Sequence, residues 1–279
     1  MSCSKSERRG CLIKTESGVM RLILRTFSLM AMNNNPIEGA TTNTMTTAAV
    51  ATRKMKVLCL HGRCQSGSIM SNKIAGARKK LQRVYDLDFL DAPFEIKTIV
   101  ANDGDQQQSP PPPRQLEWWT RDESTGKPQS NVKEAFEYVI KSTKDKDYDA
   151  VIGFSQGGLL GTAMVLMGAF PTVRAVVTAG SPFRLEPFDA SDRFVLELEQ
   201  EESSNIKQRG KDIPKLHFAG ETDKMVPVNS VQQLCEVGGN GRVIIHEKGH
   251  LFPTKAVYVN EMLEFLKMTL DDDDVKHQK

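Results

Sequence analysis

The sequence predicts an α/β protein in which a mainly parallel central sheet carries helices on both faces. Two observations support this prediction. Short apolar runs alternate along the chain with segments that have a helical period, and this alternation implies right-handed βαβ crossovers. The runs are apolar at consecutive positions, which is typical of strands that are buried on both sides.

The predicted fold begins with an apolar run at 56–61, which ends at Gly62 and indicates a buried strand that continues into a loop. A helical segment at 71–85 and a second strand at 88–93 follow. Residues 101–130 have no hydrophobic period, and the proline run within them favours an extended polyproline spacer or loop.

The same alternation continues to the end of the chain. Residues 131–144 predict a helix, because their apolar side chains recur at spacings of three and four. A polar, acidic insertion with helical character is expected at 184–212. The remaining strands are expected at 149–153, 174–179, 215–219 and 242–246, and the remaining helices at 157–167, 228–236 and 256–270.

The composition is that of an ordinary globular protein, with 39% hydrophobic and 26% charged residues among 279. No run of eighteen or more apolar residues occurs, so no membrane span is expected. The five cysteines are odd in number and lack C-x-x-C spacing. They argue against a disulfide scaffold or a cysteine zinc site and for a reducing or an indifferent compartment. We therefore expect a cytoplasmic protein.

The positive charge of the chain is concentrated at its start. Residues 1–54 contain eight Lys/Arg and three Asp/Glu, whereas the rest contains 29 basic and 32 acidic residues, a net charge of −3. The body of the protein therefore offers no basic stripe, and it contains no ribonucleoprotein signature or zinc-finger spacing. Nucleic acid is not an expected partner.

The chain divides into three parts by composition. Residues 1–54 are rich in Ser, Thr, Asn, Met and Arg, which is typical either of a disordered extension or of an organellar transit peptide. In the second case the protein would be plastid or mitochondrial rather than cytoplasmic. Residues 55–270 form the expected folded domain, and 271–279 an acidic, disordered tail.

A nucleophile-elbow pattern follows the strand expected at 149–153. It reads Gly153-x-Ser155-x-Gly157, and its glycines leave room for a serine on a strained strand-to-helix turn. The apolar run before it and the Gly- and Ala-rich helix after it support the pattern. A serine at the start of that helix would have a backbone N–H and the positive helix end facing its oxyanion. The alternative is a glycine-rich turn without chemistry.

A catalytic serine needs a histidine as base and a carboxylate as acid. In chains with this elbow, the acid follows the serine and the histidine follows the acid. Of the five histidines, His250 is the best base, because it lies on a loop just past the last expected strand. Asp223, on the loop after the strand at 215–219, is preferred as the acid over Glu221. Asp223 could alternatively cap the following helix.

The oxyanion hole requires two backbone N–H groups. One is expected from Gln156, which directly follows the serine, and one from Arg63, on the loop after the first strand. Cys64 competes with Arg63 for this position. Its thiol is a poor candidate for the nucleophile, since no histidine or helix start adjoins it in the sequence.

Four ordered motifs resemble the FSH-type serine hydrolases of the α/β-hydrolase superfamily, over about residues 55–268. They are His61-Gly-x-x-Gln-Ser-Gly67, Gly153-Phe-Ser-Gln-Gly157, Gly220-Glu-Thr-Asp-x-x-Val-Pro227 and Gly249-His-x-x-Pro253. The resemblance implies an α/β-hydrolase fold, the triad Ser155, Asp223 and His250, and hydrolysis of small-molecule carboxylic esters or thioesters. It also implies that neither a cofactor nor a metal takes part.

Two aromatic features are expected near the substrate. The pair Trp118-Trp119 resembles an aromatic pair in the variable loop of the family, and forms either a hydrophobic wall for an acyl chain or part of the core. Phe154 either lines the same pocket or packs on the sheet.

Two other readings remain open. The Gly-Phe-Ser-Gln-Gly segment also resembles acyl-protein thioesterases and carboxylesterases of the same fold. A non-catalytic binding protein on a hydrolase fold is the more distant alternative. The sequence carries no prediction of the oligomeric state.

Overall fold

The computed structural model of this chain describes residues 53–96, 113–121, 131–196 and 200–271. The predictions of a targeting or disordered extension at 1–54 and of an acidic tail at 271–279 fall almost entirely outside these residues. The proline run expected to form a spacer within 101–130 also lies outside them, except for Pro113. No helix in the described part of the chain is both long and apolar enough to cross a membrane.

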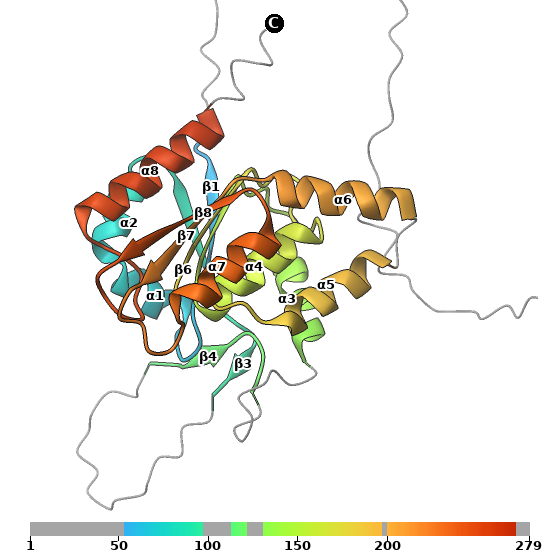
Figure 1. The fold of residues 1–279 in the computed structure, drawn as a ribbon, viewed down its shortest axis with the longest axis horizontal. Helices are drawn as coiled ribbons and strands as arrows, with labels where there is room; N and C mark the ends of the chain where they lie inside the picture. Colours follow the sequence, from blue (N-terminus) through green and yellow to red (C-terminus); the bar gives the residue numbers. More distant parts are fainter. Residues whose placement is uncertain (1–52, 97–112, 122–130, 197–199, 272–279) are drawn as a thin grey trace, which may run out of the picture. The chain divides into compact units, whose positions relative to one another are not determined.

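A parallel sheet forms the centre of the described structure, which confirms the predicted fold class (Figure 1). Every neighbouring pair of its strands is parallel, and their order across the sheet is β2-β1-β5-β6-β7-β8. The strands are β1 (Lys56–Leu60), β2 (Asp86–Leu90), β5 (Ala150–Phe154), β6 (Ala175–Ala179), β7 (Lys215–Gly220) and β8 (Gly241–His246).

Helices cover both faces of this sheet. One face carries α1 (Gly67–Lys73), α2 (Ala75–Leu81) and α8 (Ala256–Asp271), and the other carries α3 (Val132–Thr143), α4 (Gln156–Leu166) and α7 (Val228–Gly238). In β1, Leu58 and Leu60 pack toward α3 and α4, whereas Val57 and Cys59 pack toward α1, α2 and α8. Burial on both faces is the physical reason why the run is apolar at consecutive positions.

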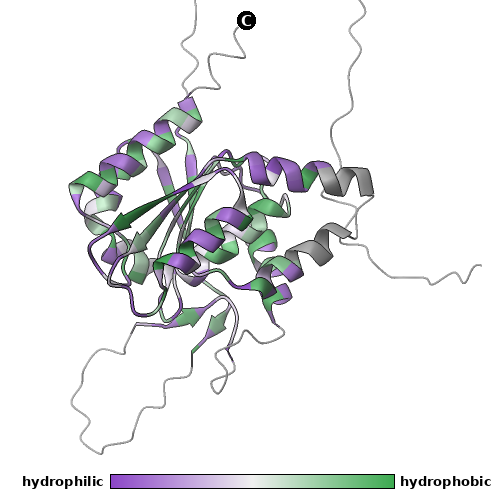
Figure 2. Ribbon diagram, in the orientation of Figure 1, coloured by the Kyte–Doolittle hydropathy of each residue, from purple (hydrophilic) through white to green (hydrophobic). Residues whose placement is uncertain are grey.

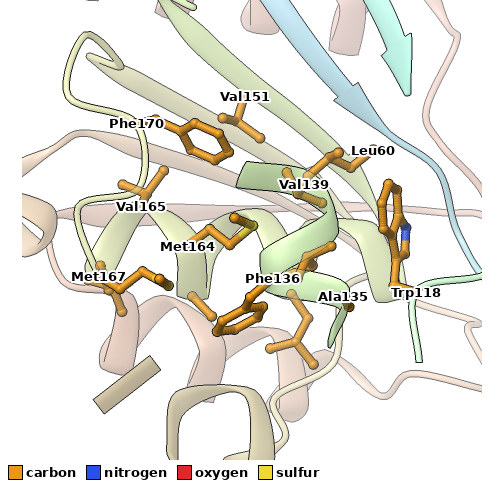
Figure 3. Close-up of a cluster of buried hydrophobic side chains, with 14 of the residues drawn as sticks. Leu60, Trp118, Ala135, Phe136, Val139, Val151, Met164, Val165, Met167 and Phe170 are labelled. Carbon is orange, nitrogen blue, oxygen red and sulfur yellow. The ribbon is translucent and has the colours of Figure 1, made fainter. Parts of the chain in front are cut away.

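The larger apolar cluster lies between the sheet and helices α3 and α4 (Figure 3). Helix α4 is buried along its whole length. The acidic insertion expected at 184–212 forms two helices, α5 (Leu185–Leu196) and α6 (Gln200–Asp212), and both contact α4. Where Figure 2 colours α6, the helix is mostly purple, in agreement with its polar sequence.

The structure corrects three predicted elements. The helix expected at 71–85 is divided into α1 and α2, because the backbone leaves the helical conformation at Ile74 (φ −97°, ψ 21°). The second strand starts earlier than expected, at Asp86. A short antiparallel ribbon of β3 (Phe94–Glu95) and β4 (Leu116–Glu117) was not predicted, since strands of two residues show no hydrophobic period.

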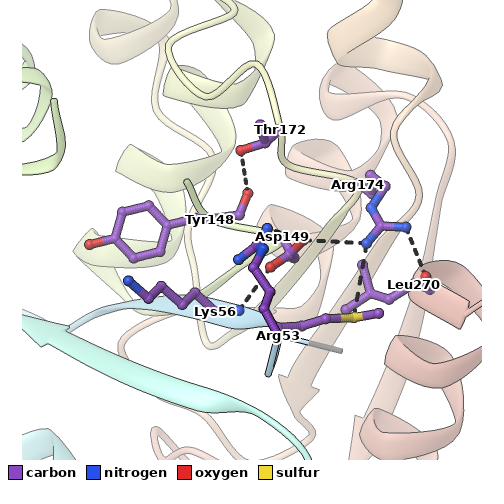
Figure 4. A network of polar contacts seen from close by, with 8 residues as sticks. Arg53, Lys56, Tyr148, Asp149, Thr172, Arg174 and Leu270 are labelled. Carbon is purple, nitrogen blue, oxygen red and sulfur yellow. Dashed lines mark hydrogen bonds and ion pairs between the residues drawn. The ribbon is translucent and has the colours of Figure 1, made fainter. Parts of the chain in front are cut away.

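A buried carboxylate ties together the amino ends of β1, β5 and β6 (Figure 4). Asp149 Oδ2 accepts a hydrogen bond from Lys56 N at 2.8 Å. Its Oδ1 forms ion pairs with Arg53 at 3.1 Å and Arg174 at 3.3 Å. Arg174 also donates to the carbonyl of Leu270 at the end of α8. This network stabilises the end of the sheet opposite to the predicted elbow.

Candidate active site

The candidate site lies at the carboxyl ends of β1 and β5. After β1 the chain forms β2 on one side of it and then returns to form β5 on the other side. The strand order therefore reverses between β1 and β5. Ligand sites of open α/β sheets form at such points. Gly62 follows β1 here, and a Cβ atom at Gly62 would lie 2.7 Å from the ring of Phe154 and 3.3 Å from Ser155 Cβ.

Ser155 has the strained backbone of a nucleophile elbow. Its φ of 50° and ψ of −118° place a non-glycine residue at positive φ, directly between β5 and α4. Such strain persists only where the surroundings enforce it. A Cβ atom at Gly157 would overlap the carbonyl oxygens of Leu60 and His61, and one at Gly153 would overlap Gly158. The glycines of the motif therefore allow the turn to pack against β1.

A continuous chain of hydrogen bonds links three of the predicted side chains. His250 Nε2 lies 3.1 Å from Ser155 Oγ, and His250 Nδ1 lies 2.7 Å from Asp223 Oδ2. The side chain of Asp223 is fully buried. Its Oδ1 accepts hydrogen bonds from the backbone N–H groups of Met225 and Val226, at 2.8 and 2.9 Å. These bonds orient the carboxylate toward the imidazole.

The competing carboxylate, Glu221, is exposed, and its backbone N–H donates to the carbonyl of His246. Asp223, the carboxylate preferred from the sequence, is thus the one that contacts His250. The suggestion that Asp223 only caps α7 does not fit, because the cap residue of that helix is Pro227 and it lacks a side-chain cap bond.

The imidazole of His250 is held from two further sides. The ring of Phe154 lies 5.0 Å from it, centroid to centroid, at an interplanar angle of 40°. Gly180 follows β6 at a φ of 55°, and a Cβ atom there would lie 3.1 Å from the imidazole. Gly220 lets the acid loop approach the base loop, since a Cβ atom there would overlap the carbonyls of Lys248 and Gly249. Phe154 therefore packs on the base as well as on the sheet.

Three other histidines are buried and have structural contacts. His61 Nε2 accepts from Ala92 N at 3.0 Å and Nδ1 donates to the carbonyl of Gly62, which assigns the neutral tautomer. Burial lowers the pKa of His61, of His246 and of His217, the last to about 4. His217 lies on β7 beside Thr178, with its Nδ1 2.8 Å from Thr178 Oγ1. His277 lies outside the described residues.

The two expected oxyanion donors belong to segments that adjoin Ser155. Gln156 is the first residue of α4, and Arg63 follows Gly62 on the loop after β1. The side chain of Gln156 is fully buried: its Oε1 accepts from Trp118 N and its Nε2 donates to the carbonyl of Trp119, both at 2.9 Å. This role of the Gln156 side chain is not predicted by the sequence, because its partners lie 38 and 37 positions away in the chain.

The tryptophan pair belongs to the core. Trp118 and Trp119 are 0% and 1% exposed and pack within the larger apolar cluster, where Trp118 lies beside Leu60 (Figure 3). The indole N–H of Trp118 donates to the carbonyl of His61 at 2.8 Å. The predicted acyl-chain wall is therefore wrong for these rings, and the core alternative holds. The Gln156 side chain is hydrogen-bonded to the backbone of both tryptophans.

Cys64 lies on the same loop, exposed and at a φ of 60°. Its Sγ lies 3.8 Å from Arg63 Nη1. Arg63 in turn forms an ion pair of 2.7 Å with the buried carboxylate of Glu117. The described contacts of the Cys64 thiol thus include an arginine but no histidine that could activate it.

Comparison with known families gives a match over most of the chain. The model of the family described as serine hydrolase (FSH1) matches residues 50–262. The esterase OVCA2 of Danio rerio is 27% identical over 233 residues, which cover 76% of this chain and 96% of that protein. The dihydrofolate reductase of Schizosaccharomyces pombe is 27% identical over 240 residues. This chain spans only about half the length of that relative, with 81% of its own length aligned.

Solved structures agree on the fold. The acyl-protein thioesterase 2 of Zea mays has a TM-score of 0.54 at 16% identity, and covers 79% of this chain and 96% of its own. SOBER1 of Arabidopsis thaliana has a TM-score of 0.52 at 21% identity, and covers 77% of this chain and 99% of its own. At these identities the similarity concerns the α/β-hydrolase fold alone.

Proposed function

We propose that this chain, which belongs to the FSH1 family of serine hydrolases, cleaves carboxylic esters or thioesters of small to medium acyl groups through Ser155, His250 and Asp223. The hydrogen-bonded chain from Asp223 through His250 to Ser155 is the observation that carries the proposal. A serine hydroxyl becomes nucleophilic when a neutral imidazole accepts its proton, and a carboxylate stabilises the imidazolium that forms.

The first half of the reaction forms an acyl-enzyme. His250 Nε2 takes the proton of Ser155 Oγ as this oxygen attacks the carbonyl carbon of the substrate. Asp223 remains ionised and holds the proton on His250 Nδ1, which keeps Nε2 free to accept. The imidazolium then donates its proton to the leaving alcohol or thiol, and the carbon–oxygen or carbon–sulfur bond breaks.

The second half of the reaction hydrolyses the acyl-enzyme. A water molecule gives a proton to His250 and attacks the same carbonyl, and Ser155 Oγ leaves with that proton. In both halves the carbonyl oxygen becomes negatively charged. The backbone N–H of Gln156 at the start of α4 and that of Arg63 are the proposed donors to this oxyanion, with the positive helix end adding to the field.

A thioesterase acting on acylated proteins is the second candidate. The Gly153-Phe-Ser-Gln-Gly157 segment, which also resembles acyl-protein thioesterases, favours including it. The two candidates share the same chemistry and differ in the leaving group. They are separated by comparing turnover of small aryl esters with deacylation of an S-acylated protein.

The proposal is tested with a fluorophosphonate probe, which labels activated serines covalently. We expect labelling of the wild type and none of Ser155→Ala. A panel of aryl esters of increasing acyl length then measures the size of the acyl site. Failure to label the wild type, combined with no ester turnover, would overturn the proposal and favour the non-catalytic binding protein.

A further inference from the structure

A short segment of the chain, Leu116–Trp119, lies against the loop that follows β1. Leu116 N donates a hydrogen bond to the carbonyl of Gln65 at 2.7 Å, as part of an isolated antiparallel bridge between these two residues. Two positions further along the segment, the indole N–H of Trp118 donates to the carbonyl of His61 at 2.8 Å. The 116–119 segment therefore holds the loop at two places.

An ion pair holds the middle of the same loop. Arg63 lies between the two bonded carbonyls in the sequence, and its Nε is 2.7 Å from Glu117 Oε2. The side chain of Glu117 is 6% exposed, and a buried carboxylate is costly unless it is paired. Cys64, the next residue of the loop, has a φ of 60°, and such strain persists only where the surroundings enforce it. The 116–119 segment thus supports a loop with a strained backbone.

The 116–119 segment also contacts the residue of the second proposed oxyanion donor. Trp118 N donates to Gln156 Oε1, and Gln156 Nε2 donates to the carbonyl of Trp119. Trp118 therefore connects two segments, since its backbone N–H binds the residue after Ser155 and its indole N–H binds the carbonyl of His61. The segment has support of its own, because β4 pairs with β3 in the antiparallel ribbon.

We propose that Glu117 and Trp118 are positioning residues of the oxyanion hole, which hold the backbone N–H of Arg63 where the transition state requires it. This inference rests on the proposed function and deepens it. A donor stabilises an oxyanion when it lies about 2.7–3.1 Å from that oxygen, and a displacement of about 1 Å can cost a hundredfold in rate. Both side chains are buried, so each acts through the loop that it holds.

The two tryptophans allow a matched comparison. Trp118→Phe removes an indole N–H that donates to His61, whereas Trp119→Phe removes one that is buried without a hydrogen-bond partner among the described residues. The two side chains are 0% and 1% exposed, so the loss of packing is similar. We expect Trp118→Phe to lower kcat about tenfold and to change KM by less than about twofold. Trp119→Phe should lower kcat by less than about threefold.

Two buried carboxylates allow a second comparison. Glu117→Gln weakens the charge-assisted bond to Arg63 and should lower kcat about tenfold. Asp149→Asn is the matched control, because that carboxylate is also 6% exposed and paired with arginines, at the opposite end of the sheet. It should lower the Tm and leave kcat unchanged. Turnover of a 4-methylumbelliferyl ester is measured below the Tm of every variant, per serine that the fluorophosphonate probe labels.

A double-mutant cycle tests whether Glu117 acts through Arg63. Arg63→Met keeps the backbone N–H and removes the guanidinium, so it should lower kcat by about as much as Glu117→Gln. Because both changes remove the same contact, the double variant should lose no more activity than either single variant. A loss equal to the product of the two single losses would overturn the positioning role of Glu117.

A further readout does not depend on turnover. An aryl trifluoromethyl ketone adds to Ser155 Oγ and places an oxyanion in the proposed hole. Its dissociation constant, measured by calorimetry, should rise in Trp118→Phe and Glu117→Gln by about the factor by which kcat/KM falls. An active wild type with unchanged kcat in both variants would overturn the positioning role and leave the proposed function intact. A wild type that neither hydrolyses esters nor reacts with the fluorophosphonate would overturn the function, and the positioning role with it.

Discussion

Gln156 Oε1 accepts a hydrogen bond from Trp118 N at 2.9 Å, although the two residues are 38 positions apart. The Nε2 of the same side chain donates to the carbonyl of Trp119. The residue after Ser155 thus holds the Trp118–Trp119 segment by its side chain, while its backbone N–H belongs to the proposed oxyanion hole. One residue thus connects the proposed chemistry of the elbow to the packing of the core.

Replacing Gln156 by Leu should destabilise the protein, because the change leaves the N–H of Trp118 and the carbonyl of Trp119 buried without their partner. Each such group costs about 1–3 kcal/mol. We expect the free energy of unfolding, measured in urea, to fall by roughly 2–6 kcal/mol. Gln233→Leu, on an exposed position of α7, is the matched control and should change it by less than about 0.5 kcal/mol. Equal effects at the two positions would show that the hydrogen bonds of the Gln156 side chain to Trp118 and Trp119 do not stabilise the fold.

The two acidic candidates differ in a measurable way. Asp223→Asn should lower kcat by about 10⁴-fold, because the amide no longer holds the productive tautomer of the imidazole. Glu221→Gln should change kcat by less than about threefold, since its exposed side chain lacks such a role. Turnover of a 4-methylumbelliferyl ester measures both. A severe loss at Glu221 together with a mild loss at Asp223 would reverse the assignment of the acid.

The tight approach of the elbow to β1 predicts a contrast between two glycines. A Cβ atom at Gly157 would overlap the carbonyl oxygens of Leu60 and His61, which are backbone atoms and cannot rotate away. We expect Gly157→Ala to lower the free energy of unfolding by roughly 2–4 kcal/mol.

Gly76→Ala is the counterpart of this change. Gly76 lies in α2, and no atom would lie within 4 Å of a Cβ there. Alanine has the higher helix propensity, so the free energy of unfolding should rise by about 0.5–1 kcal/mol. Urea unfolding of the two variants beside the wild type measures both effects. A stabilised Gly157→Ala protein would show that β1 and α4 are not packed as described.

His217 makes the stability depend on pH. Burial, and then the charge of Lys215, lowers its pKa to about 4 from the 6.5 of an exposed histidine. Below pH 6.5 the unfolded chain binds a proton at this position that the folded protein does not, so stability falls as the pH falls toward 4. The full effect is about 3 kcal/mol.

The measurement is urea unfolding between pH 7.5 and pH 4.5 for the wild type and for His217→Asn, which keeps a polar partner for Thr178. The variant should lose less stability over this range than the wild type, whatever its stability at pH 7.5. Parallel pH profiles of the two proteins would contradict a neutral His217 in the folded state.

The elements that the sequence predicted well are those with a local cause. The strand at Ala150–Phe154 and the helix at Gln156–Leu166 agree with expectation to within one or two residues. Both are specified by their apolar residues and by the glycines on either side of Ser155, where the strand and the helix meet. The break at Ile74 and the β3–β4 ribbon were not predicted, because the first has no breaker residue at its position and the second pairs residues more than twenty positions apart.

The sequence by itself determined the fold class, the elbow around Ser155 and the order of the acid and the base along the chain, since each depends on residue type and spacing within a short motif. The tertiary structure determined which residues from distant segments contact one another and which of them are buried. It buries Asp223 against His250 and leaves Glu221 exposed. It also placed the tryptophan pair in the core. Burial and charge proximity are properties of the packed chain, and no local pattern contains them.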